Sequence, residues 1–354
     1  MNELLDYYWS KIKLLIIPYL LFMFLLVFPI NYYVLTPGGI TPVENLITVD
    51  YNQDKVIEGS ISSTYVMSVN RPSFFEFIIG YFSKYSSIDK LSGSNLSYTN
   101  EEITQISFVD KATSVDASII VAYNEMSKNN SEILIAYDEA ILVYGKSTYL
   151  SNYDTIAFGD EFIQMVGDND VICTTTSEIA VNSQLGNTYT FTFRNAEGET
   201  YIVDLTKNED TGLFGITLKL YYIVIKEDTF PSYSEASTNI GGPSGGLLQT
   251  LSIYNMLSDT DITHGLKIAG TGTIDYDGSV GYIGGVKQKV ATAYLNRVDI
   301  FFMPYLDETY YYDNYMEALR ACEELGIDPE GWLVPVASFA DALDYLNNLG
   351  GDLS

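Results

Sequence analysis

The feature that most constrains this chain is an apolar segment close to its N-terminus. Residues 14–35 are apolar except for Asn31 and a few tyrosines, and Pro18 and Pro29 lie near the two ends. About 20 such residues cross a bilayer as a helix, because a helix satisfies its backbone hydrogen bonds internally. The alternative is a cleaved signal peptide, but the segment is long for one and no small-x-small cleavage site follows it. We therefore expect residues 1–36 to be a cytoplasmic tail and an uncleaved transmembrane anchor.

The basic residues around this segment predict its orientation. Lys11 and Lys13 precede it, and the next basic residue is Lys55. Positive charge near a span stays in the cytoplasm. We expect a single-pass protein of the cell membrane with its N-terminus in the cytoplasm and everything after about residue 36 outside it.

Charge and composition exclude several classes of partner. The chain has 46 acidic and 18 basic residues, a net charge of −28, which disfavours nucleic acid and anionic lipid surfaces as main ligands. With one histidine and two cysteines, it lacks a cluster with metal-ligand spacing, so we expect no metal and no cofactor. Cys173 and Cys322 fall in segments assigned below to different domains, and we expect two separate buried thiols rather than a disulfide.

The rest of the chain divides into three segments of different texture, which together predict an α+β fold. Residues 37–130 contain a strand near 59–69 and a helix from about 100 to 122, and we expect this extracytoplasmic segment to pack with the C-terminal domain. Residues 131–218 read as short strands and turns. Residues 219–354 alternate strands with helices, beginning with a strand at 221–225.

The order of elements in residues 131–218 resembles a PDZ domain. A strand follows Gly159-Asp160, then come a short helix near 177–185 and a hairpin over 188–205. The resemblance implies an inserted domain that binds an extended peptide as an added strand. The usual glycine-rich carboxylate-binding loop would fall at residues 136–139, which contain no glycine, so recognition of a C-terminal carboxylate is left open. The alternative is a small β-rich domain that only positions the anchor.

Two glycine-flanked segments carry the candidate chemistry, Gly-Gly-Pro-Ser-Gly-Gly at 241–246 and Gly-Gly-Val-Lys-Gln-Lys at 284–289. Ser244, at the start of a predicted helix, lies among unpaired N–H groups that suit the oxyanion of an acyl-transfer intermediate. A lysine acts as its base only when neutral, which requires a lowered pKa. Taken singly, the serine also reads as a helix cap and the lysines as surface residues. Helical spacing does not choose between Lys287 and Lys289.

Read together with Ala-Gly-Thr-Gly-Thr-Ile at 269–274 and the stretch 277–289, the segment 241–246 resembles the proteolytic domain of Lon-type proteases. With the anchor and the PDZ-like insertion, the chain resembles the membrane-anchored PDZ–Lon proteases of Gram-positive bacteria. The resemblance implies that residues 219–354 are a Lon-type Ser-Lys proteolytic domain.

The same resemblance assigns roles to residues. Ser244 falls on the nucleophile, Lys289 on the general base, and Thr271 on a threonine that orients the lysine amine. The supporting positions are in the loop around the serine: Gly242, Pro243 and Gly245. Gly245 is a departure, because many relatives carry alanine there.

No Gly-x-x-x-x-Gly-Lys-Ser/Thr motif for ATP occurs in the sequence. We therefore expect an ATP-independent extracytoplasmic serine endopeptidase that cleaves extended peptides or exposed protein segments. The alternative is a catalytically silent peptide-binding or scaffold protein at the cell surface. Since Lon domains assemble into rings, a homo-oligomer is a further expectation.

Overall fold

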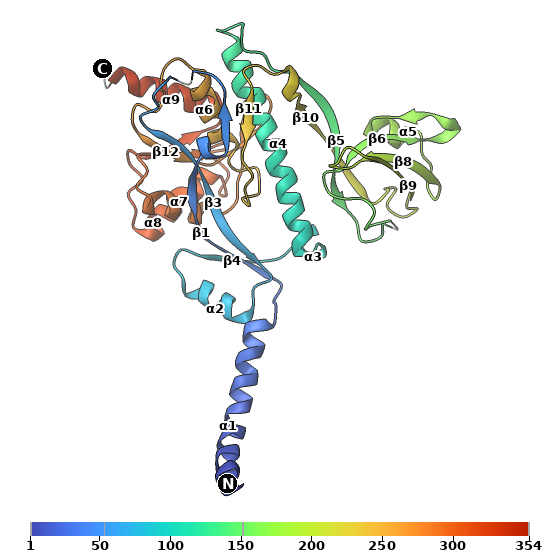
Figure 1. The fold of residues 1–354 in the computed structure, drawn as a ribbon, viewed down its shortest axis with the longest axis vertical. Helices are drawn as coiled ribbons and strands as arrows, with labels where there is room; N and C mark the ends of the chain where they lie inside the picture. Colours follow the sequence, from blue (N-terminus) through green and yellow to red (C-terminus); the bar gives the residue numbers. More distant parts are fainter. Residues whose placement is uncertain (1, 53, 151, 353–354) are drawn as a thin grey trace.

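The computed structural model describes residues 2–52, 54–150 and 152–352. It is a mixed α+β structure with two principal sheets, and helix α1 (Asn2–Val27) projects from the body (Figure 1). Within those residues, α1 is the one helix long and apolar enough to cross a membrane, over Tyr7–Val27, and none of that stretch is buried. The predicted apolar N-terminal helix is therefore confirmed, but it ends at Val27, and residues 32–35 of the apolar run belong instead to strand β1 (Tyr32–Pro42).

The larger sheet has the order β16-β15-β12-β3-β1-β4. Its parallel part joins β3, β12, β15 and β16, whereas β1 pairs antiparallel with β3 and with β4. The bounds of its strands are β1 Tyr32–Pro42, β3 Ser60–Asn70, β4 Ser87–Lys90, β12 Lys267–Gly270, β15 Ile300–Pro304 and β16 Leu333–Val336. Residues 32–90 thus supply half of this sheet, and the C-terminal residues supply the other half.

Helices cover both faces of the larger sheet, so a strand between them such as β15 is apolar along its whole length. All five residues of β15 are buried; Phe302 packs on one face, and Phe301 and Met303 pack on the other. The first face carries α4, α6 and α9, and the second carries α7 and α8. These helices span α4 Asn100–Ser127, α6 Gly246–Leu257, α7 Val286–Leu295, α8 Asn314–Leu325 and α9 Phe339–Asp352.

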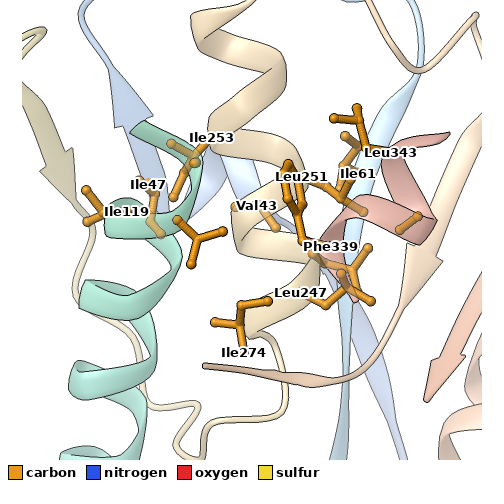
Figure 2. Close-up of a cluster of buried hydrophobic side chains, with 14 of the residues drawn as sticks. Val43, Ile47, Ile61, Ile119, Leu247, Leu251, Ile253, Ile274, Phe339 and Leu343 are labelled. Atoms are coloured by element: carbon orange, nitrogen blue, oxygen red, sulfur yellow. The ribbon is translucent and has the colours of Figure 1, made fainter. Parts of the chain in front are cut away.

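The main core lies where α6 is enclosed between α4, the sheet and α9. Figure 2 shows Leu247 and Leu251 of α6 among Ile119 of α4, Ile61 of β3 and Phe339 of α9. Apolar residues occur all round α6, which is the pattern of a fully buried helix. This burial fixes the start of α6, which follows the candidate nucleophile directly.

The smaller sheet lies on the other side of α4 from the larger one (Figure 1) and has its own aromatic core. Its order is β10-β5-β6-β8-β9, with β7 paired to β6 and the short helix α5 following β7. The bounds are β5 Tyr137–Lys146, β6 Glu161–Val166, β7 Ile172–Cys173, α5 Thr176–Val181, β8 Thr188–Arg194, β9 Thr200–Thr206 and β10 Ile216–Val224. The predicted hairpin is confirmed as β8–β9.

Strand β10 differs from its predicted place. The sequence suggested a strand at 221–225 opening the C-terminal domain, but β10 pairs along its length with β5 of the smaller sheet, from Ile216–Lys146 to Val224–Tyr137. The reason is that sheet partners depend on long-range register, which a local apolar run does not encode.

The remaining elements are short or connect the two sheets. They are β2 Ile47–Val49, paired with β11 Tyr233–Glu235; β13 Thr273–Ile274, paired with β14 Val280–Gly281; and the helices α2 Phe74–Phe82 and α3 Ser94–Ser97. Cys173 and Cys322 are both buried and free, as predicted. Helix α4 runs to Ser127, about a turn beyond its expected end, and begins with a capping box between Thr99 and Glu102.

Candidate active site

The loop that carries Ser244 is held in a defined shape by glycine and by helix α4. Gly242 has φ +88°, in the left-handed region that glycine adopts without strain, and its N–H donates to the Ser107 carbonyl at 2.6 Å. Ser114 of α4 donates to the Pro243 carbonyl at 3.0 Å. Of the predicted supporting residues, Gly242 and Pro243 therefore shape this loop through their backbone conformation and backbone hydrogen bonds.

Ser244 does not cap helix α6. The N-cap position is Gly245, which makes no side-chain capping bond, and the first helical residue is Gly246. The structural reading of Ser244 as a capping residue is therefore wrong, and its hydroxyl is not engaged in holding the helix. Within the described part of the chain, no group accepts a hydrogen bond from the N–H of Ser244 or Gly245. Two backbone donors next to the hydroxyl are thus free to bind an oxyanion.

Lys289 is on the first turn of α7 and lines the same cleft as the Ser244 loop. It is 2% exposed, and its Nζ donates to Thr271 Oγ1 at 2.8 Å. Burial disfavours the ammonium form, so the pKa of Lys289 falls from 10.5 to about 7. Near neutral pH, a substantial fraction of this lysine is a free amine that can accept a proton.

Thr271 joins the lysine to the serine. This fully buried residue follows β12, and its Oγ1 donates to the Ser244 carbonyl at 3.0 Å. The N–H of Gly272 donates to the same carbonyl at 2.9 Å. Ser244 is therefore fixed by two hydrogen bonds from the segment that also fixes the lysine.

Ser244 and Lys289 line one cleft with a volume of ≈ 590 Å³. Its walls come from β1, β3, the nucleophile loop and the turn before α7. No hydrogen bond joins Ser244 Oγ to Lys289 Nζ among the atoms that the structure describes. A larger cavity of ≈ 800 Å³ lies between α4 and the smaller sheet, but none of the predicted site residues lines it.

The other candidate base lies outside the cleft. Lys287 Nζ is 2.7 Å from Glu324 Oε2, in a pair at the surface of α7 and α8. The single histidine also does not line the cleft, and its Nε2 is 3.0 Å from the Leu346 carbonyl oxygen. Of the basic side chains considered from the sequence, only Lys289 is both buried and beside Ser244.

Residues 226–313 match the Lon protease (S16) C-terminal proteolytic domain. The chain carries a Lon-type proteolytic domain, a serine peptidase domain. The match includes Ser244, Thr271 and Lys289, and it excludes the smaller sheet and α1.

Three curated relatives are Lon proteases, and each is similar to this chain over only a part of both sequences. A Lon protease of Mesomycoplasma hyopneumoniae is 31% identical over 124 residues, 35% of this chain and 13% of its own length. Lon protease 2 of Borreliella burgdorferi is 32% identical over 117 residues, 32% of this chain and 13% of its own. A Lon protease of Ureaplasma parvum is 42% identical over 72 residues, 20% of this chain. The similarity thus spans about an eighth of the first two relatives.

Residues 37–130 were expected to pack with the C-terminal domain, but the sequence did not indicate that α4 of this segment holds the nucleophile loop. Ser107, Ser114 and Ser118 lie on one face of α4 and bond to the nucleophile loop or the first residue of α6. The signal was present as small polar residues at helical spacing, but it gains meaning only once α4 is known to pack on α6.

Lys111 lies on the same face of α4, between Ser107 and Ser114, and lines the cleft. Nothing in its local sequence distinguished it from a surface lysine.

Proposed function

We propose that this protein is a membrane-anchored serine endopeptidase that uses Ser244 as nucleophile and Lys289 as general base. The observation that carries the proposal is the buried Lys289 amine, held by Thr271 and sharing a cleft with the serine. A lysine with a pKa near 7 suits proton transfer at physiological pH.

The proposed reaction is a two-step acyl transfer. Ser244 Oγ attacks the peptide carbonyl carbon and its proton passes to the neutral Lys289 amine. The N–H groups of Ser244 and Gly245 stabilise the oxyanion, and the leaving amine takes the proton from Lys289 as the peptide bond breaks. Water then attacks the acyl-enzyme ester, gives a proton to Lys289, and the proton returns to Ser244 as the acid product leaves.

An extended substrate is favoured by the sheet beside the site. Strand β12 pairs with β3 only from Ser60 to Ser63, and residues 64–67 of β3 continue along the cleft wall. In the described residues, no other strand pairs with that edge, so its backbone groups are open to a peptide in extended form.

The smaller sheet forms a second part of the proposal, as a PDZ-like peptide-binding domain. An apolar groove of ≈ 200 Å³ lies between α5 and the start of β10, lined by Ile179, Phe214 and Ile216 among others. Strand β10 is at the edge of its sheet, which suits strand addition. Gly212, which lines this groove, and Gly215 lie just before β10, which supports that segment, rather than residues 136–139, as the counterpart of the glycine-rich loop.

For the domain division, we propose the segments 1–36, 37–130, 131–218 and 219–354, with the third boundary moved so that β10 joins the PDZ-like domain.

We further propose that α1 anchors the protein with its N-terminus in the cytoplasm and that the folded body lies outside. The exposed apolar surface of α1 and the lysines that precede the apolar run support the anchor. Independence from ATP is part of the proposal, because the chain has no ATP-binding motif.

The test is hydrolysis of a quenched-fluorescent peptide library by the detergent-solubilised full chain and by Ser244→Ala. We expect cleavage by the wild type without ATP and a loss of at least about 1,000-fold in the variant. Ser107→Ala, which leaves its backbone carbonyl for Gly242, is the matched control and keeps the activity. Equal cleavage by wild type and Ser244→Ala would favour the silent scaffold instead.

A further inference from the structure

Helix α2 exposes an unusually apolar surface next to the end of α1. Six large apolar side chains of this nine-residue helix are exposed, and Tyr81 and Phe82 are 71% and 81% accessible. The six are Phe74, Phe75, Ile78, Ile79, Tyr81 and Phe82. The surfaces of soluble proteins rarely carry so many aromatic and branched residues in one place, so this patch indicates a site that binds another molecule or a membrane.

The other face of α2 is already occupied. Phe77 stacks edge-on against Tyr32 of β1, with ring centroids 5.2 Å apart. Gly80 is buried, and a Cβ there would meet Val34 Cγ1 at 2.7 Å. Strand β1 therefore holds α2 rigidly and leaves the apolar patch facing outward.

The level of α2 matches the end of the proposed span. The apolar stretch Tyr7–Val27 has 21 residues, about 31 Å of helix, which equals the hydrocarbon thickness of a bilayer. Just beyond it, the Ile30 N–H donates to the Pro72 carbonyl at 3.0 Å. Inside the stretch, close to its end, Phe22 of α1 contacts Phe75 of α2 with ring centroids 6.3 Å apart. Figure 1 shows α2 beside the upper end of α1.

Charge does not oppose burial of this patch in lipid. The single carboxylate of α2, Glu76, accepts hydrogen bonds from the N–H and hydroxyl of Ser73 in a capping box at the helix start. Lys84 follows the helix and lies over the Tyr85 ring, 4.8 Å from its centroid. Aromatic residues and a flanking lysine are typical of helices at a membrane–water interface.

We propose that α2 lies in the interface of the outer leaflet, with its six exposed apolar side chains among the lipid acyl chains, as a second membrane contact. This proposal rests on the anchoring role of α1. Two contacts prevent rotation of the body about α1. Because Tyr33 of β1 lines the cleft six residues after Val27, the two contacts hold the part of the cleft at Tyr33 within about 20 Å of the bilayer. The substrates that fit are protein segments close to the membrane surface.

Fluorescence quenching by brominated phosphatidylcholine tests this in vesicles containing the full chain. Single-tryptophan variants carry Phe82→Trp, or Ile202→Trp on the far sheet as a matched exposed control, with Trp9 and Trp332 replaced by phenylalanine. A third variant keeps Trp9 of α1 and replaces only Trp332. Circular dichroism confirms that each variant is folded.

We expect the brominated lipid to reduce tryptophan fluorescence by at least about twofold at positions 9 and 82 and not to change it at position 202. Quenching at 9 without quenching at 82 overturns the interfacial helix and leaves the anchor intact. An unquenched Trp9 instead overturns the anchor, and with it the proposal. An unquenched residue 82 in a chain that forms oligomers shows that a second copy covers the patch, which equally overturns the lipid contact.

An independent observation concerns the charge of the cleft. The described residues that line it include Lys111 and Lys289 but no aspartate or glutamate, although the whole chain has 46 acidic residues against 18 basic ones. Lys111 makes no ion pair or hydrogen bond with the described residues. Burial lowers its pKa, and the charge of Glu235 offsets only part of this effect. Lys111 lies on α4 between Ser107 and Ser114, both bonded to the nucleophile loop, and thus lines the cleft beside that loop.

We infer that Lys111 is a specificity-determining residue that binds a carboxylate side chain of the substrate near the scissile bond. The inference rests on the proposed peptidase activity. The test compares kcat/KM for pairs of peptides that differ only by glutamate or glutamine at one position along the peptide.

We expect the wild type to prefer glutamate by about tenfold at one position, and the preference to fall to about one in Lys111→Met and to return in Lys111→Arg. Equal cleavage of both peptides of every pair by the wild type overturns the inference. If the folded wild-type protein cleaves neither peptide of any pair, the peptidase proposal itself fails.

Discussion

Lys289 Nζ donates a hydrogen bond of 2.8 Å to Thr271 Oγ1, and Thr271 passes its own hydroxyl hydrogen to the Ser244 carbonyl at 3.0 Å. The threonine hydroxyl therefore acts as acceptor for the lysine and donor to the serine backbone. A neutral amine that donates one hydrogen to Thr271 keeps its lone pair for the Ser244 proton.

The two lysines of α7 differ in their predicted effect on activity. Lys289→Met removes the proposed base, so kcat for peptide cleavage falls by about 100- to 10,000-fold. Lys287→Met removes only an exposed ion pair with Glu324, and kcat stays within about twofold. Steady-state kinetics of the two variants decides between them, and a loss of activity confined to Lys287→Met would reverse the assignment.

Replacing Thr271 tests its role in orienting the lysine. Thr271→Val keeps the volume but removes both hydrogen bonds, so we expect kcat to fall by about 10- to 100-fold. Thr271→Ser retains the hydroxyl and serves as the control, with most of the activity. Thermal denaturation of both variants separates an orienting role from a loss of folding, because equal stability with unequal kcat supports orientation.

The activity depends on pH through Lys289. Only the neutral amine accepts the Ser244 proton, so kcat/KM rises with pH up to about 7 and then levels off. A profile over pH 5–9 measures this pKa in the free enzyme. A plateau that begins only above pH 9 would mean that the lysine is not desolvated in solution.

The same burial makes Lys289 costly for stability. Its pKa is about 7 when folded and near 10.4 in an unfolded chain, so between these values the unfolded state binds more protons and wild-type stability rises with pH. Lys289→Met removes this term, and we expect its Tm to exceed that of the wild type by several degrees at pH 6 and by less at pH 9. Calorimetry at the two pH values checks the trend. A Tm difference that does not change with pH would contradict it.

The groove between α5 and β10 is predicted to select substrates. Ala180 lines this groove, and Ala180→Arg fills it with a long charged side chain. We expect the ratio of kcat/KM for long over short peptides to fall by about 5- to 10-fold. Val181→Arg, one residue further along α5 and 82% exposed, is the control and leaves this ratio unchanged. An unchanged ratio in both variants would favour a positioning role for the smaller sheet.

Much of the fold was predictable because the signals are local. The apolar N-terminal run predicts α1, and alternation in residues 188–206 predicts the β8–β9 hairpin. The C-terminal part also alternates strands with helices as predicted, from α6 at Gly246–Leu257 to α9. Strand β10 was misplaced because its partner, β5, is distant in sequence.

For the site, Thr271 was indicated only by a family resemblance. The sequence by itself determined the other candidates, one serine and two lysines in glycine-flanked segments. It could not choose between Lys287 and Lys289 by helical spacing, and only a family resemblance pointed to the second. The tertiary structure distinguished them by burying Lys289 against Thr271 and leaving Lys287 paired with Glu324 at the surface. Burial depends on what packs around a residue from distant segments, and the pKa of a lysine follows from that burial.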